Sequence, residues 1–249
     1  MGQVIAVVSG KGGTGKTSFT ALVGAALARL GYRTLCMDCD IGLRNLDLAL
    51  GLSDRALMDF SDVIARRATL SEAIVQHPRC EKLYLLTAPI QLDAENIPSE
   101  QMLALADEIR SNFDFCLIDA AAGLGGAFRL STCAADRIIV VSTTDSTALR
   151  DAQHTVMLLR HFPAGKLHLV VNRVRRKLLK ALKSNLDDAI DAAGLPLLGV
   201  IPEDEEIPLA LGRSTMGFFP RRSYAEKACK NIALRLTGQH VPLMKLPKR

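Results

Sequence analysis

The sequence predicts an α/β protein built on a doubly wound, mostly parallel sheet flanked by helices. Two observations carry this prediction. Short apolar runs alternate along the chain with stretches of helical spacing, and the first run, 4–8, leads through a glycine-rich loop into a helical stretch at 18–30. Such alternation favours parallel strands joined by right-handed crossovers, with a ligand at the carboxyl ends of the strands. At 249 residues and 49% hydrophobic, one large domain is sufficient.

The individual elements follow from apolar spacing and from stop signals. Strands are expected at 4–8, 34–37, 83–87, 113–119, 137–142, 167–171 and 197–201. Helices are expected at 18–30, 57–64, 69–76, 98–112, 147–160 and 178–193. The last of these carries an apolar stripe and ends at Gly194, which favours a helix that covers the sheet. The segment 41–51 is expected to form a loop and a turn.

Charge and cysteine content limit the classes of function. The net charge is +5 and the pI is about 9.0, a mild basic excess that permits anionic partners but lacks the dense basic patch of a dedicated nucleic-acid reader. The six cysteines include no Cys-x-x-Cys pair, which favours buried free thiols in a reducing cytosol over disulfides or metal. No apolar stretch approaches the roughly 20 residues that span a bilayer, so we expect a cytoplasmic protein.

The first loop fits the phosphate-binding pattern of glycine, four residues, glycine, lysine and serine or threonine. Its glycines allow close backbone approach, so successive N–H groups can point at phosphate oxygens. Lys16 adds a positive charge with an expected catalytic role, and Thr17 offers a hydroxyl to Mg²⁺. A turn of purely structural meaning would not need these two side chains. The ATP-binding residues expected here are Gly10, Lys11, Gly12, Gly13, Thr14, Gly15, Lys16, Thr17 and Ser18.

Three acids, Asp38, Asp40 and Asp119, stand at the ends of expected strands. Carboxylates in this position belong to the ligand edge of an open α/β sheet. Asp119 follows an apolar run, as does the acid that holds Mg²⁺, usually through a water, in phosphate-loop triphosphatases. Of Asp38 and Asp40, one would position the attacking water and one would support the metal shell. The alternative for these two is the capping of a helix or turn.

Lys11 is a second lysine near the start of the loop, and the ordinary phosphate cradle does not require it. With it, the loop resembles the deviant Walker A (ParA/MinD) family of P-loop ATPases, which is marked by Lys-Gly-Gly-x-Gly-Lys-Thr. The resemblance implies that Lys11 reaches the ATP of a second subunit. ATP would then induce a homodimer, and Lys11 would act catalytically by the logic of an arginine finger. The alternative is a solvated surface lysine.

The stretch 38–48, with Gly-Leu-Arg-Asn-Leu-Asp-Leu at its core, is similar to switch I in the branch of this family that selects the bacterial division site. By that resemblance Asp40 assists the attacking water, Asp38 supports the metal, and Asn45 lies at the dimer interface. The segment 148–152 also resembles that branch, which implies a partner-binding role for Asp151.

The adenine side of the site is implied by two further segments that resemble the family. The amide of Asn172 would offer a donor and an acceptor to the base edge, although an asparagine at a strand end is otherwise more often a turn former. The ATP-binding residues implied here are Asn172, Arg173, Pro202 and Glu203.

The resemblance implies an ATP hydrolase that uses ATP and Mg²⁺, dimerises with them, and positions the cell-division site. Its expected partners are a division inhibitor of the MinC type and a MinE- or DivIVA-linked regulator, and nucleic acid is not expected. The alternatives are a positioning ATPase of the ParA or flagellar-number type, and a switch that binds ATP with little hydrolysis. An iron–sulfur role is disfavoured because only Cys133 falls near a suitable region.

Two segments depart from that branch. Ala120-Ala121-Ala122-Gly123 replaces the Ser-Pro-Ala-Gly that its members usually carry in switch II, so a hydroxyl and a rigid proline are missing. We expect 1–237 to form the ATPase domain and 238–249 to form a short basic tail, whose two prolines prevent the usual amphipathic membrane-binding helix. Contact with the inner membrane is therefore expected only if an anchor lies elsewhere or comes from a partner.

Overall fold

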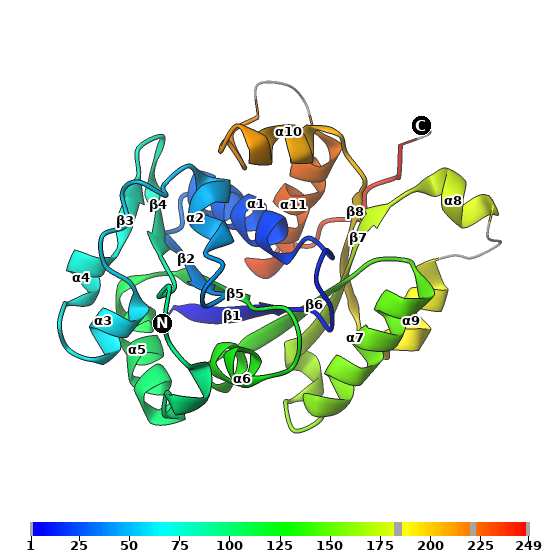
Figure 1. The fold of residues 1–249 in the computed structure, drawn as a ribbon. Coiled ribbons are helices and arrows are strands. Elements are labelled where there is room, and N and C mark those ends of the chain that lie inside the picture. The colour runs from blue at the N-terminus through cyan, green and yellow to red at the C-terminus, as the bar shows by residue number, and fades with distance from the viewer. Residues whose placement is uncertain (1, 182–185, 220–222, 248–249) are drawn as a thin grey trace.

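An eight-stranded sheet forms the middle layer of the protein, with the strands in the order β3-β4-β2-β5-β1-β6-β7-β8 (Figure 1). This computed structural model describes residues 2–181, 186–219 and 223–247. Every neighbouring pair of strands is parallel except β3 with β4. The predicted class, a mostly parallel sheet flanked by helices, is confirmed.

The strands are short, and those near the centre are almost entirely buried because helices cover both of their faces. Their bounds are β1 (Gln3–Val8), β2 (Thr34–Cys39), β3 (Val75–His77), β4 (Cys80–Leu86), β5 (Phe115–Ala120), β6 (Arg137–Ser142), β7 (Leu167–Val174) and β8 (Leu197–Pro202).

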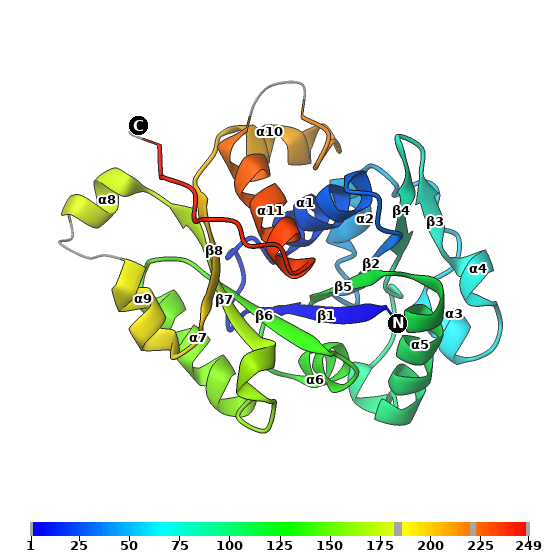
Figure 2. The same ribbon diagram turned by 180° about the vertical axis from the view of Figure 1, so that it is seen from behind.

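The helices divide between the two faces of the sheet (Figures 1 and 2). One face is covered by α1 (Lys16–Arg29), α2 (Asn45–Leu50), α10 (Glu206–Gly212) and α11 (Tyr224–Leu236). The other is covered by α3 (Phe60–Ile64), α4 (Leu70–Ala73), α5 (Ser99–Asn112), α6 (Gly126–Cys133), α7 (Ser146–Leu158) and α9 (Leu186–Ala193). The remaining elements are α8 (Arg176–Ala181) and the 3-10 turns η1 (Ala94–Asn96) and η2 (Ala164–Lys166).

Helix α1 approaches the sheet closely at Gly24, where there is no room for a side chain. A side chain at Gly24 would place its Cβ only 2.3 Å from Sγ of Cys36 on β2. Cys36 is one of six free cysteines, four of which are buried. Within the ranges that the structure describes, no helix is both long and apolar enough to cross a membrane.

Three expectations about local structure are wrong. The segment 41–51 contains α2 rather than only loop and turn, because burial against α1 stabilises this short helix. The helix expected at 69–76 stops at Ala73 and gives way to the antiparallel strand β3. The helix expected at 178–193 is replaced by α8 and α9, and Leu182 of its apolar stripe lies outside the described residues.

The segment 239–247 contains no helix or strand and passes across β8 (Figure 2). Arg235 of α11 holds it there. Its guanidinium donates from Nε to the carbonyl of Val241 at 2.9 Å, and from Nη2 to that of Pro242 at 2.8 Å. From Nη1 it also donates to the carbonyl of Leu198 on β8 at 2.9 Å. This arginine therefore joins α11, the edge strand and the final segment.

Candidate nucleotide-binding site

The glycine-rich loop connects β1 to α1 at the carboxyl edge of the sheet. Gly13 and Gly15 have φ of 78° and 90°, in the left-handed region that favours glycine. Two close contacts fix the ends of the loop. A Cβ at Gly10 would lie 2.5 Å from the carbonyl oxygen of Asp151 on α7, and one at Gly15 would lie 2.4 Å from Nδ2 of Asn172 on β7. The chain folds here because glycine permits both the turn and the close approach.

Lys16 begins α1 and is buried, with 7% of its surface exposed. Its Nζ donates to Oγ of Ser9 at 2.9 Å, and the Ser9 hydroxyl donates in turn to the carbonyl of Lys11. Burial lowers the pKa of Lys16, while the nearby charges of Asp119 and Asp40 oppose that shift. The lysine is thus held beneath the loop beside two acids, where a bound phosphate would offset the cost of burying its charge.

Asp119 and Asp38 occupy paired positions on β5 and β2, and both are almost completely buried. Burial raises the pKa of Asp119 to about 7, with a further increase from the charge of Asp38, while the hydroxyl of Thr17 and the charge of Lys16 act in the opposite sense. Burial also raises the pKa of Asp38, to about 6. Two adjacent buried carboxylates with raised pKa values form a place where a cation would be stabilised.

The two oxygens of Asp38 already accept hydrogen bonds from main-chain N–H groups. One bond comes from Asp40 at 2.8 Å and the other from Leu46, near the start of α2, at 3.0 Å. These hydrogen bonds match the alternative role considered for Asp38, the capping of a helix or turn. They order the segment between β2 and α2. The metal-supporting role of Asp38 stays a prediction.

Asp40 follows β2 and is half-buried. Burial raises its pKa, and Lys16 opposes the shift. Asn45 is the first residue of α2 and is exposed, as an interface residue would need to be. Both residues therefore lie at the carboxyl edge of the sheet, and their catalytic and interface roles stay predictions.

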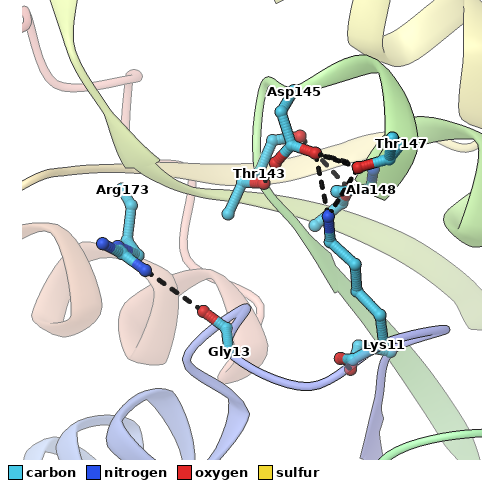
Figure 3. Close-up of polar contacts among 9 residues, drawn as sticks. Lys11, Gly13, Thr143, Asp145, Thr147, Ala148 and Arg173 are labelled. Atoms are coloured by element: carbon cyan, nitrogen blue, oxygen red, sulfur yellow. Dashed lines mark hydrogen bonds and ion pairs between the residues drawn. The ribbon is translucent and has the colours of Figure 1, made fainter.

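Lys11 points away from the loop and toward α7 (Figure 3). Its Nζ lies 2.9 Å from Oδ1 of Asp145 and 2.7 Å from Oγ1 of Thr147. Asp145 also caps α7 by accepting the N–H of Ala148, and its carboxylate accepts from the hydroxyls of Thr143 and Thr147. These four donors together hold the pKa of Asp145 well below its usual range despite an opposing effect of burial. The lysine is bound within its own chain here.

The four residues predicted for the adenine side are gathered at the carboxyl ends of β7 and β8. Nδ2 of Asn172 donates to the carbonyl of Thr14 at 2.8 Å, and its Oδ1 accepts the N–H of Arg173. Arg173 donates to the carbonyl of Gly13 (Figure 3). It also donates to the carboxylate of Glu203. The group therefore supports the loop directly, with Pro202 buried beside it at the end of β8. Its contact with a base stays a prediction.

One residue of the switch II segment lies against the loop, because a Cβ at Gly12 would lie 3.9 Å from that of Ala122. Ala120, one of the two residues that differ from the usual sequence, is buried at the end of β5. Sequence reasoning missed three groups that organise this region, Ser9, Asp145 and Thr147. Asp145 could have been found, because an aspartate directly before a helical stretch is a common N-terminal cap.

The residues present suit a magnesium nucleotide. Among the residues that the structure describes, no group of three or more His, Cys, Asp or Glu side chains could hold a metal ion unaided. Mg²⁺ usually keeps several waters and binds through one or two protein groups together with substrate phosphates. Thr17 and the buried Asp119 fit that pattern. Because the loop, the lysine and the acids all suit a phosphate-bearing ligand, the fold and site define the class as a P-loop nucleotide-binding protein.

Comparison with known proteins gives the family. Residues 5–215 match the CobQ/CobB/MinD/ParA nucleotide binding domain, and the chain belongs to this family. It is 38% identical to the septum site-determining protein MinD of Synechocystis sp. over 98% of this chain and 92% of that protein. The resemblance to the ParA/MinD family that the loop predicts is confirmed.

Two solved structures have the same fold over nearly the whole chain. One is the MinC:MinD cell division protein complex of Aquifex aeolicus, with a TM-score of 0.88 at 33% identity, covering 98% of this chain and 99% of that one. The other is MinD of Pyrococcus horikoshii with Mg-ADP, with a TM-score of 0.81 at 28% identity, covering 95% and 96%.

Proposed function

We propose that this protein is a MinD-like ATPase that binds MgATP, dimerises around it, and positions the cell-division site by recruiting a division inhibitor. ATP hydrolysis resets the cycle. The observation that carries the proposal is the convergence of buried Lys16 with Asp119, Asp38 and Asp40 beneath the glycine-rich loop. A relative of this fold solved with Mg-ADP supports the choice of nucleotide and metal.

The chemistry assigns a separate task to each group. The loop N–H groups and Lys16 hold the phosphates, and Lys16 offsets negative charge that develops during transfer. Thr17 and Asp119 hold Mg²⁺, which supplies further charge neutralisation when bound. Asp40 is half-buried at the edge of the site, with a raised pKa that suits a group that orients and accepts a proton from water.

Dimerisation requires Lys11 to leave Asp145. The ion pair is partly solvated, with 34% of the Lys11 and 52% of the Asp145 side chain exposed. Pairs of this kind contribute at most about 1 kcal/mol. Breaking this ion pair therefore costs less free energy than Lys11 would gain by binding the phosphates of a second subunit.

Partner binding is proposed at α7 and the loop together. Gly10 packs directly on the main chain of Asp151, so a change in the loop is transmitted to this part of α7. The relative solved in a MinC:MinD complex supports a MinC-type inhibitor as the partner. A MinE- or DivIVA-linked regulator would complete the cycle in the cytoplasm, with contact at the inner membrane where an anchor is supplied.

Phosphate release with MgATP tests the catalytic assignment. We expect Asp40→Ala to lower the rate at least about 100-fold, the size typical of losing a general base. Asp54→Ala removes an exposed acid outside the site and should leave the rate unchanged.

The dimer is tested by light scattering, where MgATP should double the mass of the wild type and of Lys230→Ala but not of Lys11→Ala. Equal masses for all three proteins with and without MgATP would contradict the role of Lys11.

A second candidate is an ATP-binding switch with little hydrolysis, which is favoured by Ala120 and Ala121, because they lack the hydroxyl and the rigid proline usual at these positions of switch II. It predicts that the wild type and Asp40→Ala release phosphate equally, at background level, while ATP still drives dimerisation. ATP-dependent retention on DNA that falls steeply with salt would instead indicate a ParA-type function.

A further inference from the structure

The hydroxyl of Ser9 connects the two lysines of the glycine-rich loop. Ser9 directly follows β1 and is almost completely buried, with 1% of its surface exposed. Its Oγ lies 2.7 Å from the carbonyl oxygen of Lys11 and 2.9 Å from Nζ of Lys16. A serine hydroxyl has one hydrogen to donate. Because the carbonyl takes that hydrogen, Oγ faces the ammonium group of Lys16 as an acceptor.

Lys16 is bound to this neutral oxygen although two acids lie nearby. The charges of Asp119 and Asp40 both act on Lys16, where they oppose the fall in its pKa that burial causes. Even so, Lys16 forms no ion pair with either acid within the described part of the chain. Its Nζ donates to Ser9 instead.

An ion pair at this position would hinder the binding of a ligand. The pair of Lys11 with Asp145 is partly solvated and is easily separated. Lys16 and Asp119 are both buried, so separating an ion pair between them would leave two buried charges without a partner. Such a pair would occupy both the cation that phosphates need and the carboxylate that Mg²⁺ needs. A single hydrogen bond to a neutral oxygen is weaker, so phosphate oxygens can replace it.

We propose that Ser9 is a positioning residue that keeps Lys16 apart from Asp119 and Asp40, so that the ammonium group stays available to phosphates and the carboxylates stay available to Mg²⁺. The inference rests on the proposed function in one respect, because it takes a magnesium nucleotide as the ligand of Lys16. Ser9 acts through Lys16 and needs no side-chain contact of its own with the nucleotide. The carbonyl of Lys11 fixes the direction of the hydroxyl, so the turn of the loop and the position of the ammonium group are set together.

The first arm of the test measures the affinity for MgADP by isothermal titration. Ser9→Ala should bind at least about tenfold more weakly, because a hydrogen bond to a charged group is lost and Lys16 is free to pair with an acid. Ser9→Thr keeps the hydroxyl and should stay within about threefold of the wild type. An unchanged affinity of Ser9→Ala would overturn the proposal, as would an affinity of Ser9→Thr as weak as that of Ser9→Ala.

The chain offers a matched control at the end of the neighbouring strand β6. Ser142 is as buried as Ser9, and its hydroxyl also donates to a main-chain carbonyl, that of Thr143. It has no hydrogen bond to a lysine among the described residues. Ser142→Ala should therefore bind MgADP as the wild type does, and a loss equal to that of Ser9→Ala would mean that any buried serine here has the same effect.

The second arm separates an effect on Lys16 from an effect on the loop. In a Lys16→Met background, Ser9→Ala should change the affinity for MgADP by less than about twofold, because the residue through which Ser9 acts is already gone. NMR titration is suited to the weak binding of these two variants. An equal loss in both backgrounds would show that Ser9 acts through the carbonyl of Lys11 alone, and the proposal would be wrong.

The third arm locates Lys16 without a nucleotide. In a crystal structure of nucleotide-free Ser9→Ala, Nζ of Lys16 should lie within about 3 Å of a carboxylate oxygen of Asp119 or Asp40. In the nucleotide-free wild type it should stay on Ser9. An ammonium group that keeps its wild-type position in the variant would overturn the proposal. This arm decides the role of Ser9 even if the wild type did not bind MgADP, a result that would contradict the proposed function instead.

Discussion

The two edges of the same sheet carry opposite surpluses of charge. At the carboxyl edge, buried Asp38 and Asp119 and half-buried Asp40 surround one lysine, so negative charge is in excess. At the amino edge, Arg137 and His168 lack a carboxylate partner among the described residues. Charges that a fold buries without balancing are costly, and they persist where a ligand completes the balance. The carboxyl edge suits a metal with phosphates.

The largest expected effect comes from removing the lysine at the carboxyl edge. Lys16→Ala leaves three acids facing an incoming phosphate without a cation, so we expect at least about 100-fold weaker binding of MgATP, in line with the loss of one partner from a buried charged pair. Isothermal titration of the wild type and variant measures this. Lys230→Ala provides the control, and a variant that retains its affinity would remove the charge-balance explanation of this edge.

A second prediction compares Arg110 and Arg137, two arginines at the amino edge. Arg110→Met leaves the Asp136 carboxylate without its cation. We expect this change to lower the free energy of unfolding by about 2–3 kcal/mol, somewhat less than for a fully buried pair. Arg137→Met should be neutral or stabilising. Urea unfolding of both variants gives the comparison. Equal losses would mean that Arg137 is balanced by groups within the fold.

The smallest expected effect is a pH dependence at the carboxyl edge. Burial raises the pKa of Asp119 from an ordinary 3.8 to about 7 in the folded protein. The folded state thus holds a proton that the unfolded chain releases, so this group's contribution to stability falls as pH rises through 7. Between pH 5.5 and 8, the nucleotide-free Asp119→Asn variant should gain roughly 1–2 kcal/mol relative to the wild type. Asp54→Asn should show no such relative gain.

Much of the fold could be predicted because parallel strands buried on both faces are continuous apolar runs. Arg137–Ser142 is predicted with its observed bounds, and the α/β class follows from the alternation. Helix α2 was missed because six residues are too few to show a helical period, and its stability comes from contacts with α1. Helices α6, α10 and α11 were not predicted, and β3 was expected to be the end of a helix.

The residues of the candidate site also fall into two groups, those that a local sequence pattern predicts and those that it does not. Lys16 and Asp119 are predictable because their positions follow from one loop pattern and one strand end. The bond from Lys11 to Asp145 joins residues 134 positions apart, and no local pattern reports it. Arg137 is likewise invisible in the sequence, where it is an ordinary charge at the start of a strand. Its lack of a partner appears only when the neighbouring strand and helices are in place.

The three bonds of Arg235 also determine how the molecule would respond to a mechanical pull. A force applied to the segment beyond Pro242 is transmitted through one guanidinium to both α11 and the edge strand β8. Tension would therefore load these hydrogen bonds before it reached the inner strands of the sheet. Anything attached to that segment would be tethered at a fixed point on the surface rather than on a free length of chain.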